Sequence, residues 1–136
     1  MIIGINHLTL SVRNVEQSLA FYTEVLGFRP MARWPNGAYL LAGDFWVCLV
    51  FDEETRGTAL PEYTHVAFTV APRDFVALSD QIRAAGASIW QDNRTEGASL
   101  YFLDPNGHKL EIHASDLEAR LRSAKENPWD GLEILT

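Results

Sequence analysis

An internal repeat constrains the fold of this chain more than any other feature of its sequence. His65 follows His7 by 58 positions, and Val70 follows Val12 by the same interval. Each of these segments alternates apolar and polar residues, as a strand with one buried face does, and each is followed by apolar residues at helical spacing. The repeat predicts two copies of a β-α-β-β-β unit whose equivalent faces meet.

The first copy is expected to begin with a strand over residues 3–12, in which His7 and Thr9 share one face. Asn14 is a suitable N-cap for the helix that follows, and Gly27 is a suitable residue to end it. Three further strands are expected over residues 28–34, 38–41 and 45–51.

A charged, small-residue linker over residues 52–61 separates the copies. The second copy is expected to begin with a strand over 63–70 that carries His65, followed by a helix from Pro72 to Gly86. Three strands are expected over residues 88–91, 99–103 and 109–113. The last two are joined by an Asp-Pro-Asn-Gly turn, which favours a tight hairpin.

The predicted fold class is therefore α+β, with two tandem modules in one domain. The boundaries are residues 1–136 for the domain, 1–51 and 62–113 for the modules, and 114–136 for a C-terminal helix and tail. The helix is expected to begin near Ser115 and to end at Asn127, before a proline.

Composition excludes several classes of protein. A net charge of −7 argues against a nucleic-acid partner. No run approaches the ~20 apolar residues of a membrane span, and no secretory signal pattern is found. Cys48 is the only cysteine, which rules out an internal disulfide and is typical of the cytoplasm; we expect it to be a small buried hydrophobe.

Glu111 is unusual because it lies in an otherwise apolar strand, where a carboxylate needs a partner or a solvated face. If the first strands of the two copies meet, His7 and His65 can converge on it. Two imidazoles and one carboxylate, with other positions open, suit Mn²⁺, Fe²⁺, Ni²⁺ or Zn²⁺. His113 shares the face of Glu111 and is a rival ligand, whereas His108 in the turn is expected to face solvent.

Five motifs carry a resemblance to a known family. The first copy has N-H-L-T-L at 6–10 and G-A-Y-L at 37–40, and the second has Y-T-H at 63–65. N-R-x-E-G-x-S-x-Y-F-L-D-P-x-G-H follows across 93–108, and L-E-x-H across 110–113. Together they resemble the vicinal oxygen chelate superfamily and, within it, the FosA-type fosfomycin glutathione transferases.

This resemblance implies a paired-module homodimer in which Mn²⁺ is held by His7 of one subunit and by His65 and Glu111 of its mate. Glutathione thiolate would open the epoxide of fosfomycin, with the metal stabilising the alkoxide that forms. Thr9 matches a hydroxyl near the epoxide oxygen, and Tyr39 matches the residue associated with the glutathione thiol.

The resemblance also implies sites for the phosphonate and for K⁺. The substrate-binding positions are Trp46, Tyr63, Gln91, Arg94, Thr95, Ser99, Tyr101 and Arg120. The K⁺ positions are Asn93, Glu96, Gly97 and Ser99. One position departs from the family: Gln91 stands where the family has a lysine that contacts the phosphonate, so we expect weaker phosphonate binding, with Arg94 or K⁺ as possible compensation.

Four other functions compete with this one. Hydrolysis of the epoxide by water is disfavoured, because relatives that do so use a carboxylate just before G-A-Y-L, where this chain has Asn36. An extradiol dioxygenase would use the same ligands with Fe²⁺ but needs an acid–base histidine, for which only His113 offers itself. A drug-sequestering protein of this fold would lack the metal triad, and a purely structural dimer would not need it.

Overall fold

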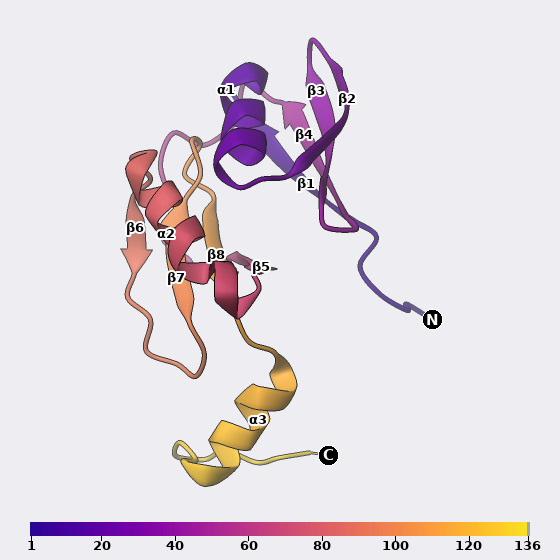
Figure 1. The fold of residues 1–136 in the computed structure, drawn as a ribbon. Coiled ribbons are helices and arrows are strands. Elements are labelled where there is room, and N and C mark those ends of the chain that lie inside the picture. The colour runs from indigo at the N-terminus through magenta and orange to yellow at the C-terminus, as the bar shows by residue number, and fades with distance from the viewer. Residues whose placement is uncertain (136) are drawn as a thin grey trace.

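The computed structural model describes residues 1–135 and contains two four-stranded sheets with the same topology (Figure 1). The first sheet, in the order β1-β4-β3-β2, comprises β1 His7–Val12, β2 Arg29–Trp34, β3 Gly37–Ala42 and β4 Phe45–Phe51. The second, in the order β5-β8-β7-β6, comprises β5 Val66–Thr69, β6 Ile89–Gln91, β7 Ser99–Leu103 and β8 Lys109–His113. In each sheet the first strand is an edge strand that pairs in parallel with the fourth. The repeat predicted from the sequence is therefore present.

Each sheet is packed by the helical segment of its own unit. The helices are α1 Val15–Ala20, the π-helix η1 Phe21–Val25, the 3-10 turn η2 Pro72–Asp74, α2 Phe75–Ala84 and α3 Leu117–Glu126. The side chain of Asn14 accepts from the backbone N–H of Gln17, which confirms it as the N-cap of α1. The single helix expected in the first unit is divided instead, because its second half is wound as a π-helix. None of the helices in residues 1–135 is long and apolar enough to cross a membrane.

Two strands are shorter than the alternating pattern predicted. The first begins at His7, and residues 1–6 continue outward without joining the sheet (Figure 1). β5 begins at Val66, so Tyr63 and His65 precede it. In both cases the alternating pattern begins before the first residue that pairs with a neighbouring strand. Residues without such a partner are not part of the sheet, so the strand begins later than the pattern does.

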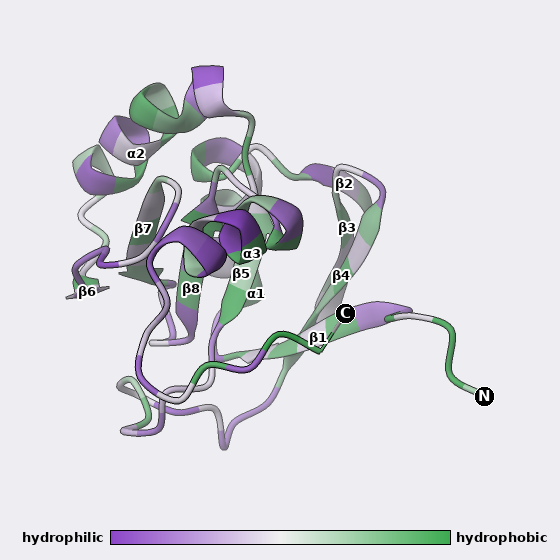
Figure 2. Ribbon diagram, turned by 90° about the horizontal axis from the view of Figure 1, so that it is seen from below, coloured by the Kyte–Doolittle hydropathy of each residue, from purple (hydrophilic) through white to green (hydrophobic). Residues whose placement is uncertain are grey.

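The apolar core lies between the sheets and their helices, where Tyr22 and Phe102 are fully buried. Figure 2 shows hydrophobic residues (green) along the strands and hydrophilic residues (purple) along α3. Figure 1 shows α3 projecting from the end of the second sheet.

Buried polar contacts join the two units within the chain. The Tyr22 hydroxyl donates to Asp104 Oδ2 at 2.7 Å, and Asn106 Nδ2 donates to Ser18 Oγ at 3.0 Å. His108 Nε2 lies 2.8 Å from the carbonyl oxygen of Ser11, and the residue is only 6% exposed. The expectation that His108 faces solvent was wrong, because the turn that carries it is covered by the first unit.

Candidate active site

Glu111 and His65 lie side by side in the second sheet. Glu111 is in β8 and is 6% exposed, while His65 directly precedes β5, the strand that pairs with β8. The distance from His65 Nε2 to Glu111 Oε1 is 3.0 Å. The sequence reasoning that sought a partner for Glu111 is supported by this contact.

The other ring nitrogen of His65 determines what this pair can bind. His65 Nδ1 lies 2.9 Å from the carbonyl oxygen of Tyr63. Because a carbonyl only accepts, Nδ1 carries the proton, which leaves the lone pair of Nε2 available when the ring is neutral. A lone pair and a carboxylate oxygen that face one another call for a cation between them. The chemistry of this donor set therefore fits a divalent metal ion.

The ring of His7 is oriented by its Nδ1 as that of His65 is, but His7 lies in the other sheet. Its Nδ1 is 2.7 Å from Asn6 Oδ1, so Nε2 is again free to act as a ligand, and its ring stacks on Trp46 with centroids 4.2 Å apart. Within residues 1–135, no three His, Cys, Asp or Glu side chains gather into a group that could hold a metal. One chain thus brings together His65 and Glu111 but does not bring His7 to them.

The remaining oxygen of Glu111 is held by the protein. Ser99 Oγ donates to Glu111 Oε2 at 2.7 Å, and His113 Nδ1 lies 2.6 Å from the same hydroxyl. His113 Nδ1 is also 3.5 Å from Glu111 Oε2. Ser99 and His113 therefore orient the carboxylate from behind, so His113 is placed as a support rather than beside His65.

Aromatic rings surround His65. Tyr63, Trp90 and Tyr101 have ring centroids 5.0, 5.3 and 5.8 Å from its own, all edge to face. Tyr101 is 4% exposed, whereas Tyr63 is 59% exposed. These rings build a wall on one side of the candidate metal centre.

Gln91 and Lys109 flank that wall. Gln91 Nε2 donates to the Tyr63 hydroxyl at 2.8 Å. Lys109 Nζ lies 5.1 Å from the centre of the Trp90 ring and donates to the Glu62 carbonyl. Alternation along β8 puts Lys109 on the same face as Glu111. The sequence indicated no role for Lys109, because its contact with Trp90 depends on pairing between strands β6, β7 and β8.

Five of the expected phosphonate and K⁺ positions, residues 93–97, form the loop between β6 and β7, and α3 holds this loop in place. Arg120 Nη2 donates to the Glu96 carbonyl at 3.1 Å and to Thr95 Oγ1 at 3.2 Å, and Arg120 Nε is 3.4 Å from Glu96 Oε2. Asn93 Nδ2 donates to the Gly97 carbonyl at 2.8 Å.

Ser115 also contacts this loop, and Arg94 lies at its surface. The other oxygen of Glu96 accepts from Ser115 Oγ at 2.7 Å. Arg94 is exposed and lines a pocket between this loop and α3. The loop therefore gathers oxygen atoms, but protein donors already occupy most of those expected to bind K⁺.

In the first sheet, Thr9, Cys48 and Tyr39 lie side by side on three neighbouring strands. Thr9 pairs with Cys48, and Cys48 pairs with Tyr39. Cys48 is 7% exposed, and its burial raises the pKa of the thiol, although a hydrogen bond with Thr9 opposes the shift. In the second sheet the equivalent strand position is Glu111, which pairs with Ala67. The first sheet thus offers a buried thiol where the second offers a carboxylate.

Trp46 links this set to His7. Tyr39 meets Trp46 edge to face at 5.2 Å, and Trp34 meets Tyr39 at 4.8 Å. Trp46 Nε1 is buried and has no acceptor within residues 1–135. Sequence reasoning missed Trp34 and Asn6; the adjacency of Asn6 to His7 was the available signal, whereas nothing in the sequence indicated the stacking of Trp34.

Comparison with known proteins identifies the class that this fold and site define. Residues 4–112 match the model of the Glyoxalase/Bleomycin resistance protein/Dioxygenase superfamily. The chain belongs to this superfamily, and its two β-α-β-β-β units are the paired modules expected from the sequence.

The relatives in sequence are thiol-transferring enzymes by name, and a structural neighbour is a fosfomycin resistance protein. The chain is 50% identical over 134 residues to the glutathione transferase FosA of Serratia marcescens, covering 97% of this chain and 95% of that one. It is 36% identical over 137 residues to the metallothiol transferase FosB of Shouchella clausii, covering 97% and 94%. A solved structure of Listeria monocytogenes FosX, complexed with Mn(II) and 1S,2S-dihydroxypropylphosphonic acid, has a TM-score of 0.77 at 29% identity, covering 90% of this chain and 98% of that one.

Proposed function

We propose that this protein is a metal-dependent fosfomycin resistance enzyme that adds the thiolate of glutathione to the epoxide of fosfomycin. The observation that carries the proposal is the His65–Glu111 pair, whose contacting atoms are 3.0 Å apart and both bear lone pairs. The 50% identity to a glutathione transferase FosA over nearly the whole chain supports the choice of thiol and substrate.

The proposed enzyme is a homodimer in which His7 of one copy joins His65 and Glu111 of the other. The separation of His7 from the other two ligands within one chain supports this arrangement. A divalent ion held there, Mn²⁺ in our proposal, would supply a Lewis acid that draws electron density from the epoxide oxygen.

In the reaction, the sulfur forms a bond to the epoxide carbon that bears phosphorus, the carbon–oxygen bond breaks, and the oxygen takes a proton. Thr9 presents a hydroxyl two residues beyond His7 on the same face of β1, where it can donate to this oxygen. Tyr39, whose ring meets Trp46 edge to face, is the residue that we assign to the thiol.

Arg120 is the cation that we assign to the phosphonate. Its contacts with Thr95 and Glu96 hold the guanidinium at the loop, where a planar donor group suits a phosphonate. The Ser99 hydroxyl lies beside Glu111, and Tyr101 pairs with Glu111 across β7 and β8. We assign both to the phosphonate site, with Trp46 and Tyr63 as its aromatic walls. We assign the exposed Arg94 to the outer edge of the phosphonate site.

K⁺ beside the phosphonate is a further part of the proposal. Its oxygen atoms would come from Asn93, Glu96, Gly97 and Ser99. Because Asn93 and Ser115 already donate to two of these groups, K⁺ binding would require rearrangement of the loop, and we derive no step of the reaction from it. We also expect the protein to act in the cytoplasm, where glutathione maintains the reducing state.

Phosphorus NMR tests the proposed reaction. Fosfomycin is incubated with the protein, Mn²⁺ and glutathione, and each component is omitted in turn. The expected result is one new phosphonate resonance that needs both metal and thiol. A resonance that needs only metal would identify the diol and a hydrolase. Metal and fosfomycin binding without turnover would identify a sequestering protein.

Glu111→Gln tests the metal centre, because it keeps the shape of the side chain and removes its charge. Mutation of a group that supports a metal ligand typically lowers metal affinity or activity by about 10–100-fold. Loss of a ligand itself should therefore lower turnover by at least about 100-fold. Mn²⁺ affinity, followed by the electron paramagnetic resonance signal of the free ion, should fall in parallel. Glu118→Gln, on the exposed side of α3, is the matched control. Full activity in Glu111→Gln would remove Glu111 from the site.

A further inference from the structure

We propose that Gln91 and Lys109 are positioning residues for the metal ligand His65, which they hold in place through the segment of residues 62–65. The inference rests on the proposed function, because it takes His65 to be a ligand of the metal ion in that site. It goes beyond that function by giving two polar side chains outside the set of metal ligands a role in building the metal centre.

His65 lies outside the hydrogen-bonded sheet that holds Glu111. Glu111 pairs with Ala67 on one side and with Tyr101 on the other, so two strands fix its backbone. His65 directly precedes β5, whose pairing with β8 begins at Val66. A metal ligand must be held to within about 0.5 Å of its productive position. Within one chain, the position of His65 therefore depends on contacts other than those of the sheet.

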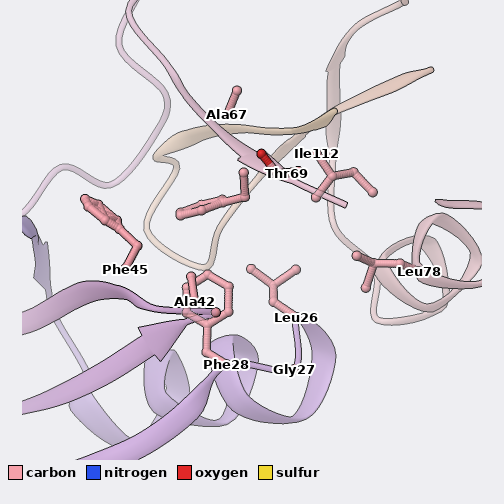
Figure 3. Close-up of a pocket in the computed structure, with 11 residues that line it drawn as sticks. Leu26, Gly27, Phe28, Ala42, Phe45, Ala67, Thr69, Leu78 and Ile112 are labelled. Carbon is pink, nitrogen blue, oxygen red and sulfur yellow. The ribbon is translucent and has the colours of Figure 1, made fainter. Parts of the chain in front are cut away.

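Packing from the first unit does not supply these contacts. Residues 67–69 of β5 line an apolar pocket of about 430 Å³, and Leu26 and Phe28 of the first unit face them across it (Figure 3). Atoms on either side of such a hollow make no contact with one another. None of residues 62–65 lines this pocket. The contacts that hold His65 come instead from the second sheet.

Tyr63 sets the orientation of the His65 ring. Its carbonyl oxygen lies 2.9 Å from His65 Nδ1, so the direction of this carbonyl decides where the lone pair of Nε2 points. Tyr63 also precedes the paired part of β5, and it is 59% exposed. A contact that fixes Tyr63 therefore fixes the metal ligand as well.

Two side chains of the second sheet hold Tyr63 at two points. Gln91, the last residue of β6, donates from Nε2 to the Tyr63 hydroxyl at 2.8 Å. Lys109, the first residue of β8, donates from Nζ to the carbonyl oxygen of Glu62 at 2.6 Å. The second bond is of the stronger kind, because its donor is charged. The peptide that enters Tyr63 and the tip of its ring are thus both fixed, which limits rotation of the carbonyl that contacts His65.

A β-bulge directs Gln91 towards Tyr63. The pairing of β6 with β7 shifts register between Ile89 and Gln91, so Trp90 is an extra residue on its strand. In a regular strand Trp90 and Gln91 would point to opposite faces of the sheet. Here both reach Tyr63, since its ring meets that of Trp90 edge to face at 5.7 Å. The Trp90 ring also holds Lys109, whose Nζ lies 5.1 Å from its centre.

A double-mutant cycle tests whether Gln91 acts through the Tyr63 hydroxyl. Gln91→Met keeps the length of the side chain and removes its donor, and Tyr63→Phe removes the hydroxyl. Each should raise the Mn²⁺ dissociation constant by about tenfold, as loss of a group that supports a metal ligand does. The double variant should bind Mn²⁺ no more weakly than either single variant, because both changes remove the same contact. Effects that multiply in the double variant would overturn the proposal.

The measurement follows the electron paramagnetic resonance signal of free Mn²⁺ in the absence of fosfomycin, so a contribution of either residue to substrate binding does not affect it. Gln17→Met, on the exposed side of α1, is the matched control and should bind Mn²⁺ as the native protein does. The secondary structure measured by circular dichroism should be unchanged in every variant.

Exchange of the His65 Nδ1 proton with water gives a second readout in the metal-free protein. Its proton resonance is assigned by its loss in His65→Gln. In the native protein the hydrogen bond to the Tyr63 carbonyl should protect this proton. Gln91→Met and Tyr63→Phe should each speed its exchange by at least about fivefold, because the carbonyl is less firmly held. Unchanged exchange in both variants would overturn the proposal.

Lys109→Met separates positional support from simple charge. Lys109 and His65 both lie against the Trp90 ring, and removal of a positive charge there should by itself tighten Mn²⁺ binding, because like charges repel. Positional support predicts the opposite sign, a dissociation constant raised by about fivefold or more. Lys109→Arg keeps the charge and the donor and should stay within about twofold of the native protein. Tighter binding in Lys109→Met would overturn the role of Lys109.

The outcomes separate this inference from the proposed reaction. Weaker Mn²⁺ binding and faster proton exchange in Gln91→Met, in a protein that does not turn over fosfomycin, would sustain the positioning role and overturn the enzyme. Metal-dependent turnover, with Mn²⁺ affinity and proton exchange unchanged in Gln91→Met, would overturn the positioning role alone.

Discussion

At the scale of single residues, binding of a negatively charged substrate depends on few cationic side chains. The protein carries a net charge of −7, yet its proposed substrate is a phosphonate. Among residues 1–135, Arg120 is the cation that hydrogen bonds hold at the loop of residues 93–97, and Lys109 is engaged with Trp90 and the Glu62 carbonyl. Gln91 contributes a neutral amide, which already orients the Tyr63 hydroxyl. Charge at position 91 should therefore limit affinity for the substrate.

Gln91→Lys is predicted to lower the KM for fosfomycin. A charge-assisted hydrogen bond to the phosphonate is worth about 1.5–3 kcal/mol, which corresponds to a change of roughly tenfold or more. The measurement is steady-state turnover against fosfomycin concentration at several ionic strengths. Gln17→Lys, which adds the same charge on α1, should leave KM unaltered. An unchanged KM in Gln91→Lys would place the phosphonate away from this residue.

At the scale of elements, a buried tyrosine joins the helical segment of the first unit to the turn of the second. Tyr22 in η1 is fully buried and donates to Asp104, which also accepts from the backbone N–H groups of Asn106 and His108. Burial, followed by the charge of Asp104 and their hydrogen bond, raises the pKa of Tyr22 well above its usual 10.0.

Tyr22→Phe is predicted to lower the free energy of unfolding by about 1–3 kcal/mol at neutral pH, because Asp104 loses a buried donor. A raised pKa in the folded state gives stability that is complete below pH 10 and declines as the pH rises further. The native protein should therefore lose stability above about pH 10, and Tyr22→Phe should lose less over that range.

Urea denaturation at pH 7 and at alkaline pH measures both effects. Tyr63→Phe is the control, because that ring is 59% exposed and should shift stability by less than about 0.5 kcal/mol. Equal alkaline losses in the native protein and in Tyr22→Phe would show that another group governs this transition.

The sequence predicted the repeat and the approximate positions of the strands because alternation and spacing are local properties of the chain. It did not predict the burial of His108, which depends on a contact with Ser11 97 positions away. Nor did it predict the π-helix of η1. It did not predict the start of β1 at His7 either, because the end of a strand depends on where its neighbour strand stops. The engagement of the Asn93 loop by Arg120 likewise depends on the docking of α3.

At the scale of the whole molecule, the two sheets carry complementary halves of a proposed site. The second sheet holds His65 and Glu111 together, and the first presents His7, Thr9 and Tyr39. Because the two units have the same topology, a twofold dimer can set the first sheet of each copy against the second sheet of the other. Such a dimer has two sites, each built from both chains.

This arrangement predicts that two inactive variants restore activity when mixed. His7→Ala and Glu111→Gln each destroy both sites of their own homodimer. In a mixed dimer, one site receives His7 from the Glu111→Gln copy and Glu111 from the His7→Ala copy, and is intact. Random reassociation makes half of the dimers mixed, so about one quarter of native turnover should return.

The control for complementation is a mixture of His65→Ala with Glu111→Gln. Both changes lie on the same side of the shared site, so every site in every dimer has at least one defective ligand, and no activity should return. Subunit exchange is verified by mass spectrometry of the native dimers. If exchange occurs and the His7→Ala and Glu111→Gln mixture stays inactive, the ligands are not shared between chains. Ligands shared between chains would also account for two features of His7. It lies apart from Glu111 within a single chain, and the contact between its Nδ1 and Asn6 leaves its Nε2 free to bind a metal.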